Sequence, residues 1–150
     1  MKSLFKKILV LIFICLLPSS KIFAEGKIKI GLVVPLSGEY SAIGDSIIKS
    51  TRLALNKIND EKFEIVPGDT KANPIDALKA SKALYDQGIK IIIGPVFNES
   101  TKYLDELNEV TFISFTNKIY GNPPNVISAG VNAISQFQTI DKFRNLNEIQ

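Results

Sequence analysis

Apolar residues are grouped in this chain into short runs, separated by longer stretches in which they recur at helical spacing. The run from Ile28 to Val34 is mostly Ile, Leu and Val, which is typical of a strand covered on both faces. It ends abruptly in a polar turn that contains Pro35, Ser37 and Gly38. Because ligands bind at the carboxyl ends of strands in open α/β sheets, this segment predicts a central strand followed by a functional loop.

The same plan repeats downstream. It predicts further strands at 63–66, 89–93, 111–115 and 126–128, and helices at 41–58, 74–87, 99–109 and 133–147. The resulting order, β-α-β-α-β-α-β-β-α, predicts an α/β fold class: a doubly wound parallel sheet with right-handed crossovers and helices on both faces.

Local signals place the helix ends. Asn73 is the expected N-cap of the second helix, with Pro74 at its first position, and Gly88 is its expected left-handed stop. Asn98 is expected to cap the third helix. The inward positions predicted by helical spacing are Ile47, Ile48, Thr51, Leu55 and Ile58 in the first helix and Tyr103, Leu104 and Leu107 in the third, whereas Lys49, Arg52 and Lys57 are expected to face outward.

Residues 1–24 have the pattern of an export signal, with three early lysines, the apolar run Ile8 to Leu17, and a short polar stretch before Ala24. We expect cleavage after Ala24, with residues 25–150 forming the exported, periplasmic domain. The alternatives are a retained membrane anchor, for which the run is short of the roughly 20 apolar residues required, and lipid attachment at Cys15, which lacks small residues before it.

The charge and the cysteine content limit the classes of function that the exported domain can have. The whole chain has a net charge of +3, but residues 25–150 carry 14 basic and 15 acidic side chains, so the basic character belongs to the predicted signal. The exported domain has no cluster of Lys and Arg of the kind that binds nucleic acid, so we expect no nucleic-acid partner. Cys15 is the single cysteine and lies in the predicted signal, so no disulfide is expected in the exported domain.

Enzyme chemistry has little support in the sequence. The chain contains no histidine, which excludes a Ser-His-Asp triad and most zinc sites. The phosphate-binding, dinucleotide-binding and nucleophile-elbow glycine motifs are absent as well. A carboxylate pair among Glu39, Asp45, Asp69 and Glu99 is the remaining acid/base alternative. We therefore predict no catalytic residues, no metal and no cofactor.

Polar side chains follow three of the predicted strands. They are Ser37 and Tyr40 after the first, Asn98, Ser100 and Thr101 after the third, and Thr116 and Asn117 after the fourth, and Gly38 in the first loop is expected to share the site. In a doubly wound sheet these ends meet at one rim, which would suit a small ligand held by hydroxyls and backbone amides. The local alternative is that Ser37 and Gly38 only form a turn, Asn98 only caps a helix and Asn117 only closes a loop.

Four segments in this order resemble the N-terminal lobe of a type I periplasmic solute-binding protein of the leucine-binding-protein group. They are IKIGLVVPLSGEYSAIGDSI, the stretch from Asp69 to Pro74, DQGIKIIIGPVFNES and FISFTN, and the likeness covers residues 27–150. The resemblance implies ligand contacts in the loop Ser37 to Tyr40, in the loop after Gly94-Pro95 and just after Ser114. It implies a periplasmic protein that delivers an amino acid or similar small polar ligand to an inner-membrane ABC permease.

GPVFNES and the ending at Asn117 are also similar to the penicillin-binding protein activators, a branch with the same fold that regulates cell-wall synthesis through contact with a synthase. Members of this fold have two lobes and about twice as many residues. The resemblance therefore implies that the chain is a truncated N-terminal lobe whose second lobe is missing, and the last predicted helix has no stop signal.

Overall fold

A computed structural model describes residues 26–146 of the chain. The predicted export signal, its cleavage site and Cys15 lie outside the described residues, as does the end of the last predicted helix. Within residues 26–146, no helix combines the length and the apolar character needed to cross a membrane.

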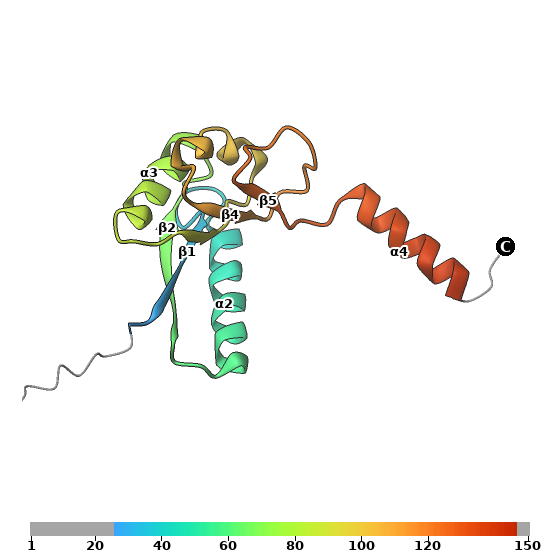
Figure 1. The fold of residues 1–150 in the computed structure, drawn as a ribbon, viewed down its shortest axis with the longest axis horizontal. Helices are drawn as coiled ribbons and strands as arrows, with labels where there is room; N and C mark the ends of the chain where they lie inside the picture. Colours follow the sequence, from blue (N-terminus) through green and yellow to red (C-terminus); the bar gives the residue numbers. More distant parts are fainter. Residues whose placement is uncertain (1–25, 147–150) are drawn as a thin grey trace, which may run out of the picture.

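The described chain is an α/β fold built on one parallel sheet of five strands, in the order β2-β1-β3-β4-β5 (Figure 1). The elements are β1 (Ile28–Val34), α2 (Ser41–Ile58), β2 (Phe63–Asp69), α3 (Pro74–Tyr85), β3 (Ile91–Ile93), two 3₁₀ turns (Asn98–Thr101 and Leu104–Leu107), β4 (Thr111–Ser114), β5 (Val126–Ser128) and α4 (Ala133–Leu146). The predicted doubly wound parallel sheet is confirmed.

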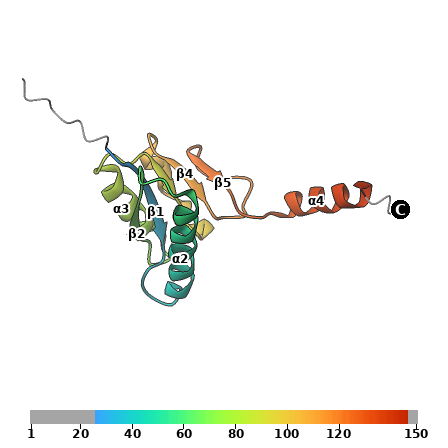
Figure 2. The same ribbon diagram turned by 90° about the horizontal axis from the view of Figure 1, so that it is seen from below.

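Helices cover both faces of the sheet, as expected from the reversal of strand order after β2. Helix α2 lies on one face, and α3 with the 3₁₀ turns lies on the other (Figures 1 and 2). The main core is on the α3 face, where Ile92, Phe112 and Val126 of three neighbouring strands pack with Leu84 and Leu104. The opposite face is covered by α2 over β1 and β2 only, because Ile91 and Ile127 remain 47% and 56% exposed.

Helix α3 begins as its sequence predicts and ends at Tyr85, two residues before the predicted end. Asn73 caps it, since its side-chain oxygen accepts a 2.9 Å hydrogen bond from the Asp76 N–H, and Pro74 occupies the first turn. Gly88 adopts the left-handed conformation at φ +83°, as expected for a residue that ends a helix. Local chemistry alone therefore determines the start of this helix.

Helix α2 has the predicted bounds and a partly different orientation. Lys49 and the other two predicted outward charges are exposed, and Ile48 and Leu55 are half-buried against β1 and β2. The prediction that Ile58 faces inward was wrong, because Ile58 is 59% exposed at the last turn, where Asn59 takes the left-handed conformation.

The predicted third helix at 99–109 was wrong. The segment forms two 3₁₀ turns, and Asn98 starts the first turn without making a side-chain cap. Its buried residues are Ser100, Thr101, Leu104 and Leu107, of which the last three recur at the three-residue spacing of a 3₁₀ helix. Tyr103, predicted to face inward, is 36% exposed.

Strand β2 is longer than predicted and continues through Pro67 and Gly68 to Asp69. Proline is tolerated there because β2 is the edge strand, so the missing N–H faces no neighbour. Strands β3 and β4 are slightly shorter than predicted, and β5 has the predicted bounds.

The side chain of Asn125, directly before β5, connects the 3₁₀ turns to the sheet through hydrogen bonds. Its side-chain amide donates hydrogen bonds to the carbonyl oxygens of Leu104 and Leu107, both at 2.9 Å, and of Val110 at 3.2 Å. These carbonyls belong to the segment that replaces a regular helix. The amide therefore satisfies backbone acceptors that an α-helix would satisfy internally.

Replacing Asn125 with alanine is expected to lower the free energy of unfolding by about 1–3 kcal/mol, because three carbonyl groups lose their donor. Asn125→Asp is expected to be more damaging at neutral pH, since it places a negative charge against the same oxygens. Urea denaturation of both variants measures the difference. Equal stability of wild type and Asn125→Asp would contradict this role, and Asn108→Ala, at an exposed position, is the control.

Candidate functional site

The candidate site is the rim formed by the carboxyl ends of β1, β3 and β4. Strand order reverses between β1 and β3, because the chain runs from β1 to β2 on one side and then crosses back to β3. The carboxyl edge at such a reversal is where ligands bind in open α/β sheets. The loops that leave these three strands carry all of the predicted ligand-binding residues.

The loop after β1 is held by Asp69 at the end of β2. The Asp69 carboxylate accepts hydrogen bonds from the Leu36 N–H at 2.8 Å, the Ser37 hydroxyl at 2.6 Å and the Lys71 N–H at 2.9 Å. Gly38 follows at φ +80°, a conformation that favours glycine. Ser37 and Gly38 therefore form an ordered turn, and the Ser37 hydroxyl already has a partner.

These hydrogen bonds also determine the protonation of Asp69. Burial alone would raise its pKa, but the Ser37 hydroxyl and the backbone N–H groups of Lys71, Leu36 and Ser37 stabilise the charged form and lower the pKa below its ordinary value. Asp69 is thus a carboxylate that organises the rim. Sequence reasoning considered it only as an acid/base candidate, although its position at a strand end was a usable signal.

We expect the contribution of Asp69 to stability to depend on pH. Its folded pKa lies below the unfolded value, so the stabilisation is complete above the unfolded pKa of about 3.9 and is lost as pH falls through the lower folded pKa. Asp69→Asn is expected to cost about 1–2 kcal/mol at pH 7 and little in strong acid. Urea denaturation across this range measures it.

Asp45→Asn, at an exposed position of α2, is the matched control and should change stability little at any pH. A cost for Asp69→Asn that does not vary between neutral and strongly acidic solution would contradict the proposed role of the charge.

The loops after β1 and β3 meet through two aromatic rings. Tyr40 and Phe97 lie edge to face, with ring centroids 4.9 Å apart and an interplanar angle of 62°. This contact spans the point where strand order reverses. Tyr40 is 43% exposed, so it both joins the loops and presents a hydroxyl-bearing ring at the surface.

The loop after β3 carries polar atoms that lack partners. Asn98 Oδ1 and Ser100 Oγ are buried and make no hydrogen bond. The Ser100 side chain is only 1% exposed, so it lies beneath the rim. Thr101 bonds the Asn98 carbonyl oxygen at 2.7 Å and closes the 3₁₀ turn.

The loop after β4 contains a buried threonine next to an exposed asparagine. Thr116 is 3% exposed, and its hydroxyl accepts a 3.2 Å hydrogen bond from the Lys118 N–H. Ser114 donates a 2.8 Å hydrogen bond to the Pro95 carbonyl oxygen and so ties this loop to the one after β3. Asn117 is exposed. Of the two predicted residues, Asn117 is the one with an exposed side chain.

A polar cavity of about 470 Å³ opens between the first 3₁₀ turn and the loop 118–123. Asn98, Lys102, Lys118 and Asn122 line it together with two carboxylates, Glu99 and Asp105. The Asn122 amide donates to the Lys118 carbonyl oxygen and the Ser128 hydroxyl, and its buried Oδ1 has no partner. Sequence reasoning missed Lys102, Lys118 and Asn122, because only the fold brings these loops together.

Among residues 26–146, no group of three or more Cys, His, Asp or Glu side chains is arranged to hold a metal ion. The loops after β1, β3 and β4 supply hydroxyl, amide and ammonium groups instead. Such groups suit reversible binding of a small polar molecule.

The strand order and the polar rim are those expected of one lobe of a type I periplasmic binding protein. A model of the periplasmic binding protein family matches residues 27–143. The chain belongs to this family.

Several individual proteins are similar. The Leu/Ile/Val-binding protein BraC3 of Rhizobium johnstonii is 30% identical over 79 residues, which are 49% of this chain and 22% of that protein. The leucine-binding protein LivK of Thermotoga maritima has a TM-score of 0.62 at 21% identity, over 80% of this chain and 37% of its own. LpoA of Haemophilus influenzae has a TM-score of 0.64 at 17% identity, over 82% of this chain and 23% of its own.

These likenesses support both resemblances seen in the sequence, since leucine-binding proteins and LpoA share the fold. The chain spans about a quarter of the length of the curated relatives it matches.

Proposed function

We propose that this chain is the N-terminal lobe of a periplasmic solute-binding protein that supplies an ABC importer with a small polar ligand, an amino acid or a close relative of one. The observation that carries the proposal is the meeting of three polar loops at the reversal of strand order, where Tyr40 and Phe97 join two of them. The family and the leucine-binding relatives support it. The partners would be the ligand and an inner-membrane permease.

In this proposal the rim contributes binding and no catalysis. Ser37, Gly38, Tyr40 and Asn117 form the open part of the site, and Asn98, Ser100 and Thr116 support it from below. A second lobe would close over the rim, and its differential affinity for the closed state would shift the population when ligand binds. A single lobe is expected to bind weakly, because it buries only one side of the ligand.

Titration of the lobe with the proteinogenic amino acids, followed by NMR chemical shifts, tests the proposal. We expect one class of amino acid to shift the signals of the three loops, and Asn117→Ala to weaken that binding by about three- to tenfold, which corresponds to the loss of one hydrogen bond. Asn108→Ala, an exposed asparagine away from the rim, should leave affinity unchanged. If no amino acid moves the rim signals, the proposal that this rim binds an amino acid is contradicted.

A second function deserves a test because the LpoA match covers as much of the chain as the LivK match and has a similar TM-score. The alternative is a penicillin-binding-protein-activator-like regulator that contacts a cell-wall synthase. The regulator would be favoured if the purified chain binds a purified synthase and no amino acid shifts the NMR signals of the rim. Binding of an amino acid at the rim without synthase binding would favour the importer.

A further inference from the structure

The Ser37 hydroxyl at the rim has a single hydrogen, and the structure shows where it goes. Its partner, 2.6 Å away, is the Asp69 carboxylate, which is charged at neutral pH and can only accept a hydrogen bond. Ser37 is exposed, and a Cβ at the neighbouring Gly38 would meet no atom within 4 Å, so the space beside the turn is open. Ser37 therefore offers a ligand only the lone pairs of its oxygen, and a group that binds there must be the donor.

Asp69 also makes the Ser37 oxygen a stronger acceptor than that of an ordinary serine. A hydroxyl that donates to a carboxylate is polarised, because hydrogen bonds in a chain strengthen one another. The backbone N–H groups of Leu36 and Lys71 hold the same carboxylate in place, at 2.8 and 2.9 Å. A cationic donor on Ser37 is attracted by the negative charge behind it, whereas a carboxylate is repelled and finds no hydrogen to accept.

Two positive features near the turn oppose this preference, and both are weaker than Asp69. The N-terminus of α2 carries roughly half a positive charge, and its Ser41 N–H already donates to the Gly38 carbonyl oxygen at 3.2 Å. The ammonium group of Lys71 is exposed, and so is the carboxylate of Glu39, which carries the opposite charge. The full charge of Asp69 therefore determines the sign of the ligand group that is favoured at this hydroxyl.

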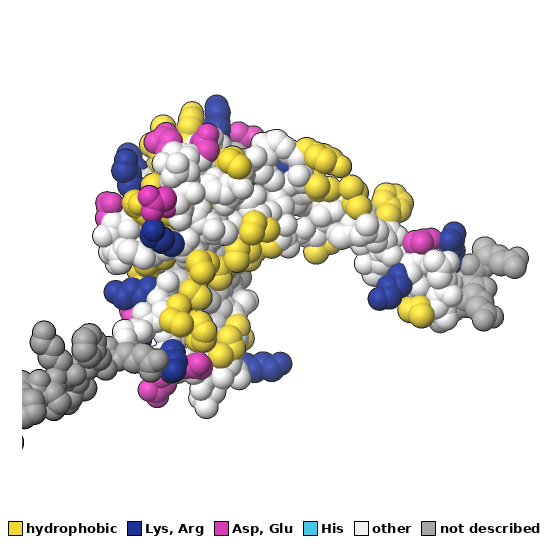
Figure 3. Space-filling model, viewed as in Figure 1, with side chains coloured by type: hydrophobic (Ala, Val, Ile, Leu, Met, Phe, Trp, Pro, Cys, Tyr) yellow, Lys and Arg dark blue, Asp and Glu magenta, His cyan; other side chains and the backbone are white. Residues whose placement is uncertain are grey.

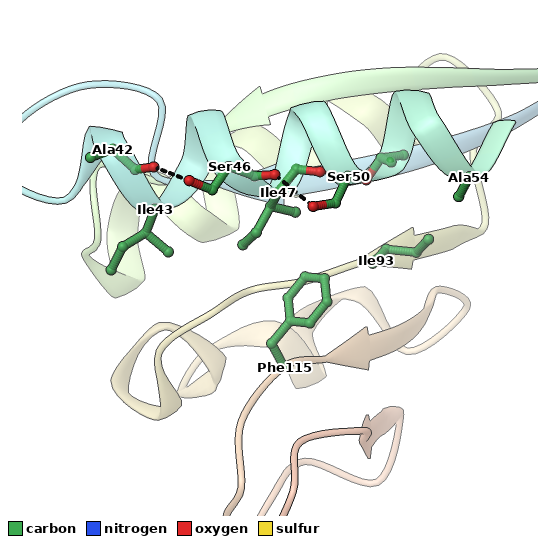
Figure 4. Close-up of a pocket in the computed structure, with 9 residues that line it drawn as sticks. Ala42, Ile43, Ser46, Ile47, Ser50, Ala54, Ile93 and Phe115 are labelled. Atoms are coloured by element: carbon green, nitrogen blue, oxygen red, sulfur yellow. Dashed lines mark hydrogen bonds between the residues drawn. The ribbon is translucent and has the colours of Figure 1, made fainter. Parts of the chain in front are cut away.

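Two serines of α2 show what distinguishes Ser37. The hydroxyls of Ser46 and Ser50 also donate, to the carbonyl oxygens of Ala42 and Ser46, both at 2.9 Å, but these acceptors are neutral (Figure 4). Both serines line an apolar cavity of about 840 Å³ together with Phe115, on the side of the molecule where hydrophobic side chains form a band (Figure 3). Burying a charged group there is costly. The turn at the rim is the better place for a charged donor.

We infer that the Ser37 hydroxyl, with the Asp69 carboxylate behind it, is the subsite that binds the ammonium group of the ligand, so that the ligand's carboxylate binds another part of the rim. This assignment rests on the proposed binding of an amino acid at the rim. Ser37 is then a specificity-determining residue, and Asp69 is a positioning residue that acts through it. The subsite depends on contacts within residues 36–71, all of which the structure describes.

Two small probes of opposite charge test the subsite. Butylammonium and butanoate are titrated separately into the purified chain, and the NMR signals of residues 37–40 report binding. Butylammonium is expected to bind there about tenfold more tightly than butanoate, because a charged donor meets a polarised acceptor. Ser37→Ala is expected to remove most of this preference, because the acceptor is lost. Ser46→Ala, which removes a hydroxyl bonded to a neutral carbonyl, should leave the preference unchanged.

Asp69→Asn separates positioning from a merely structural role. The amide of asparagine can donate to the Ser37 oxygen, which frees the hydroxyl hydrogen to point toward a ligand. The preference for butylammonium is therefore expected to fall about tenfold, so that butanoate binds at least equally well. Loss of structure alone would weaken both probes alike, and circular dichroism establishes that the variant is folded. Asp45→Asn removes the same charge from an exposed position of α2 and should keep the wild-type preference.

Three results would overturn the ammonium subsite: wild type that binds butanoate at residues 37–40 as tightly as butylammonium, wild type that binds neither probe there, and equal effects of Asp69→Asn and Asp45→Asn. The amino-acid titration keeps the two proposals apart. If an amino acid shifts the rim signals and butylammonium is not preferred, only the subsite is contradicted. If butylammonium is preferred at residues 37–40 and no amino acid binds, the acceptor role of Ser37 is supported and amino-acid binding at the rim is contradicted.

Discussion

Gly44→Ala is expected to lower the free energy of unfolding by about 3 kcal/mol or more. A Cβ at this position would lie 1.9 Å from the Pro35 carbonyl oxygen and 2.7 Å from its carbonyl carbon, both of which are backbone atoms. No side-chain rotation relieves such a contact, so the start of α2 must move away from the loop after β1. The cost outweighs the gain of about 1 kcal/mol that alanine has over glycine within a helix.

Urea denaturation measures this effect, and Ser50→Ala on the exposed side of the same helix is the control. That change should alter stability little, because the exposed hydrogen bond from Ser50 to the Ser46 carbonyl oxygen is lost while helix propensity rises. The displacement of α2 should also separate Tyr40 from Phe97, which near-ultraviolet circular dichroism detects. A Gly44→Ala variant as stable as wild type would show that the close approach of α2 to Pro35 is not required.

Gly94→Ala is the second large change, with an expected loss of about 3–5 kcal/mol. Gly94 ends β3 at φ +109°, a conformation that L side chains rarely adopt, and a Cβ would lie 2.1 Å from the Val33 carbonyl oxygen. Backbone strain and steric overlap with Val33 therefore both destabilise the variant at this position. Because Gly94 is where the chain leaves β3 for the rim, we expect ligand contacts to be lost together with stability.

Gly88→Ala separates the two causes. Gly88 also has a positive φ, of +83°, but a Cβ there would meet nothing within 4 Å. Its replacement is expected to cost about 1 kcal/mol from backbone conformation alone. Denaturant unfolding of both variants gives the comparison, and similar losses for Gly88→Ala and Gly94→Ala would contradict the role assigned to the contact with Val33.

The predicted fold came from apolar runs and helix-end signals. Continuous Ile, Leu and Val in β1 indicated a covered strand, and the Asn73-Pro74 start indicated α3. The segment 99–109 was mispredicted because apolar residues at a spacing of three fit either helix type over so short a stretch. The hydrogen bonds from Asn125 to the Leu104 and Leu107 carbonyl oxygens favour the 3₁₀ turns, and they are long-range contacts.

The candidate site was predictable in outline only. Strand-end polarity indicated which loops share the rim, and the strand order places them there. The assignment of each of these residues to ligand binding stays a prediction. Sequence alone could not show that Thr116 is buried while Asn117 is exposed, because that depends on how the loop packs against Ser114 and Gly130.

By itself, the sequence determined the parallel α/β architecture, the bounds of α2, the start of α3 and the polar character of the rim, because these follow from local periodicity and backbone chemistry. Only the tertiary structure decided which polar groups have partners. Asp69 organises the first loop through donors 32 and 33 residues away, and Asn125 holds the 3₁₀ turns through acceptors 15 to 21 residues away. These contacts join segments that are far apart in the chain, so no local sequence pattern predicts them.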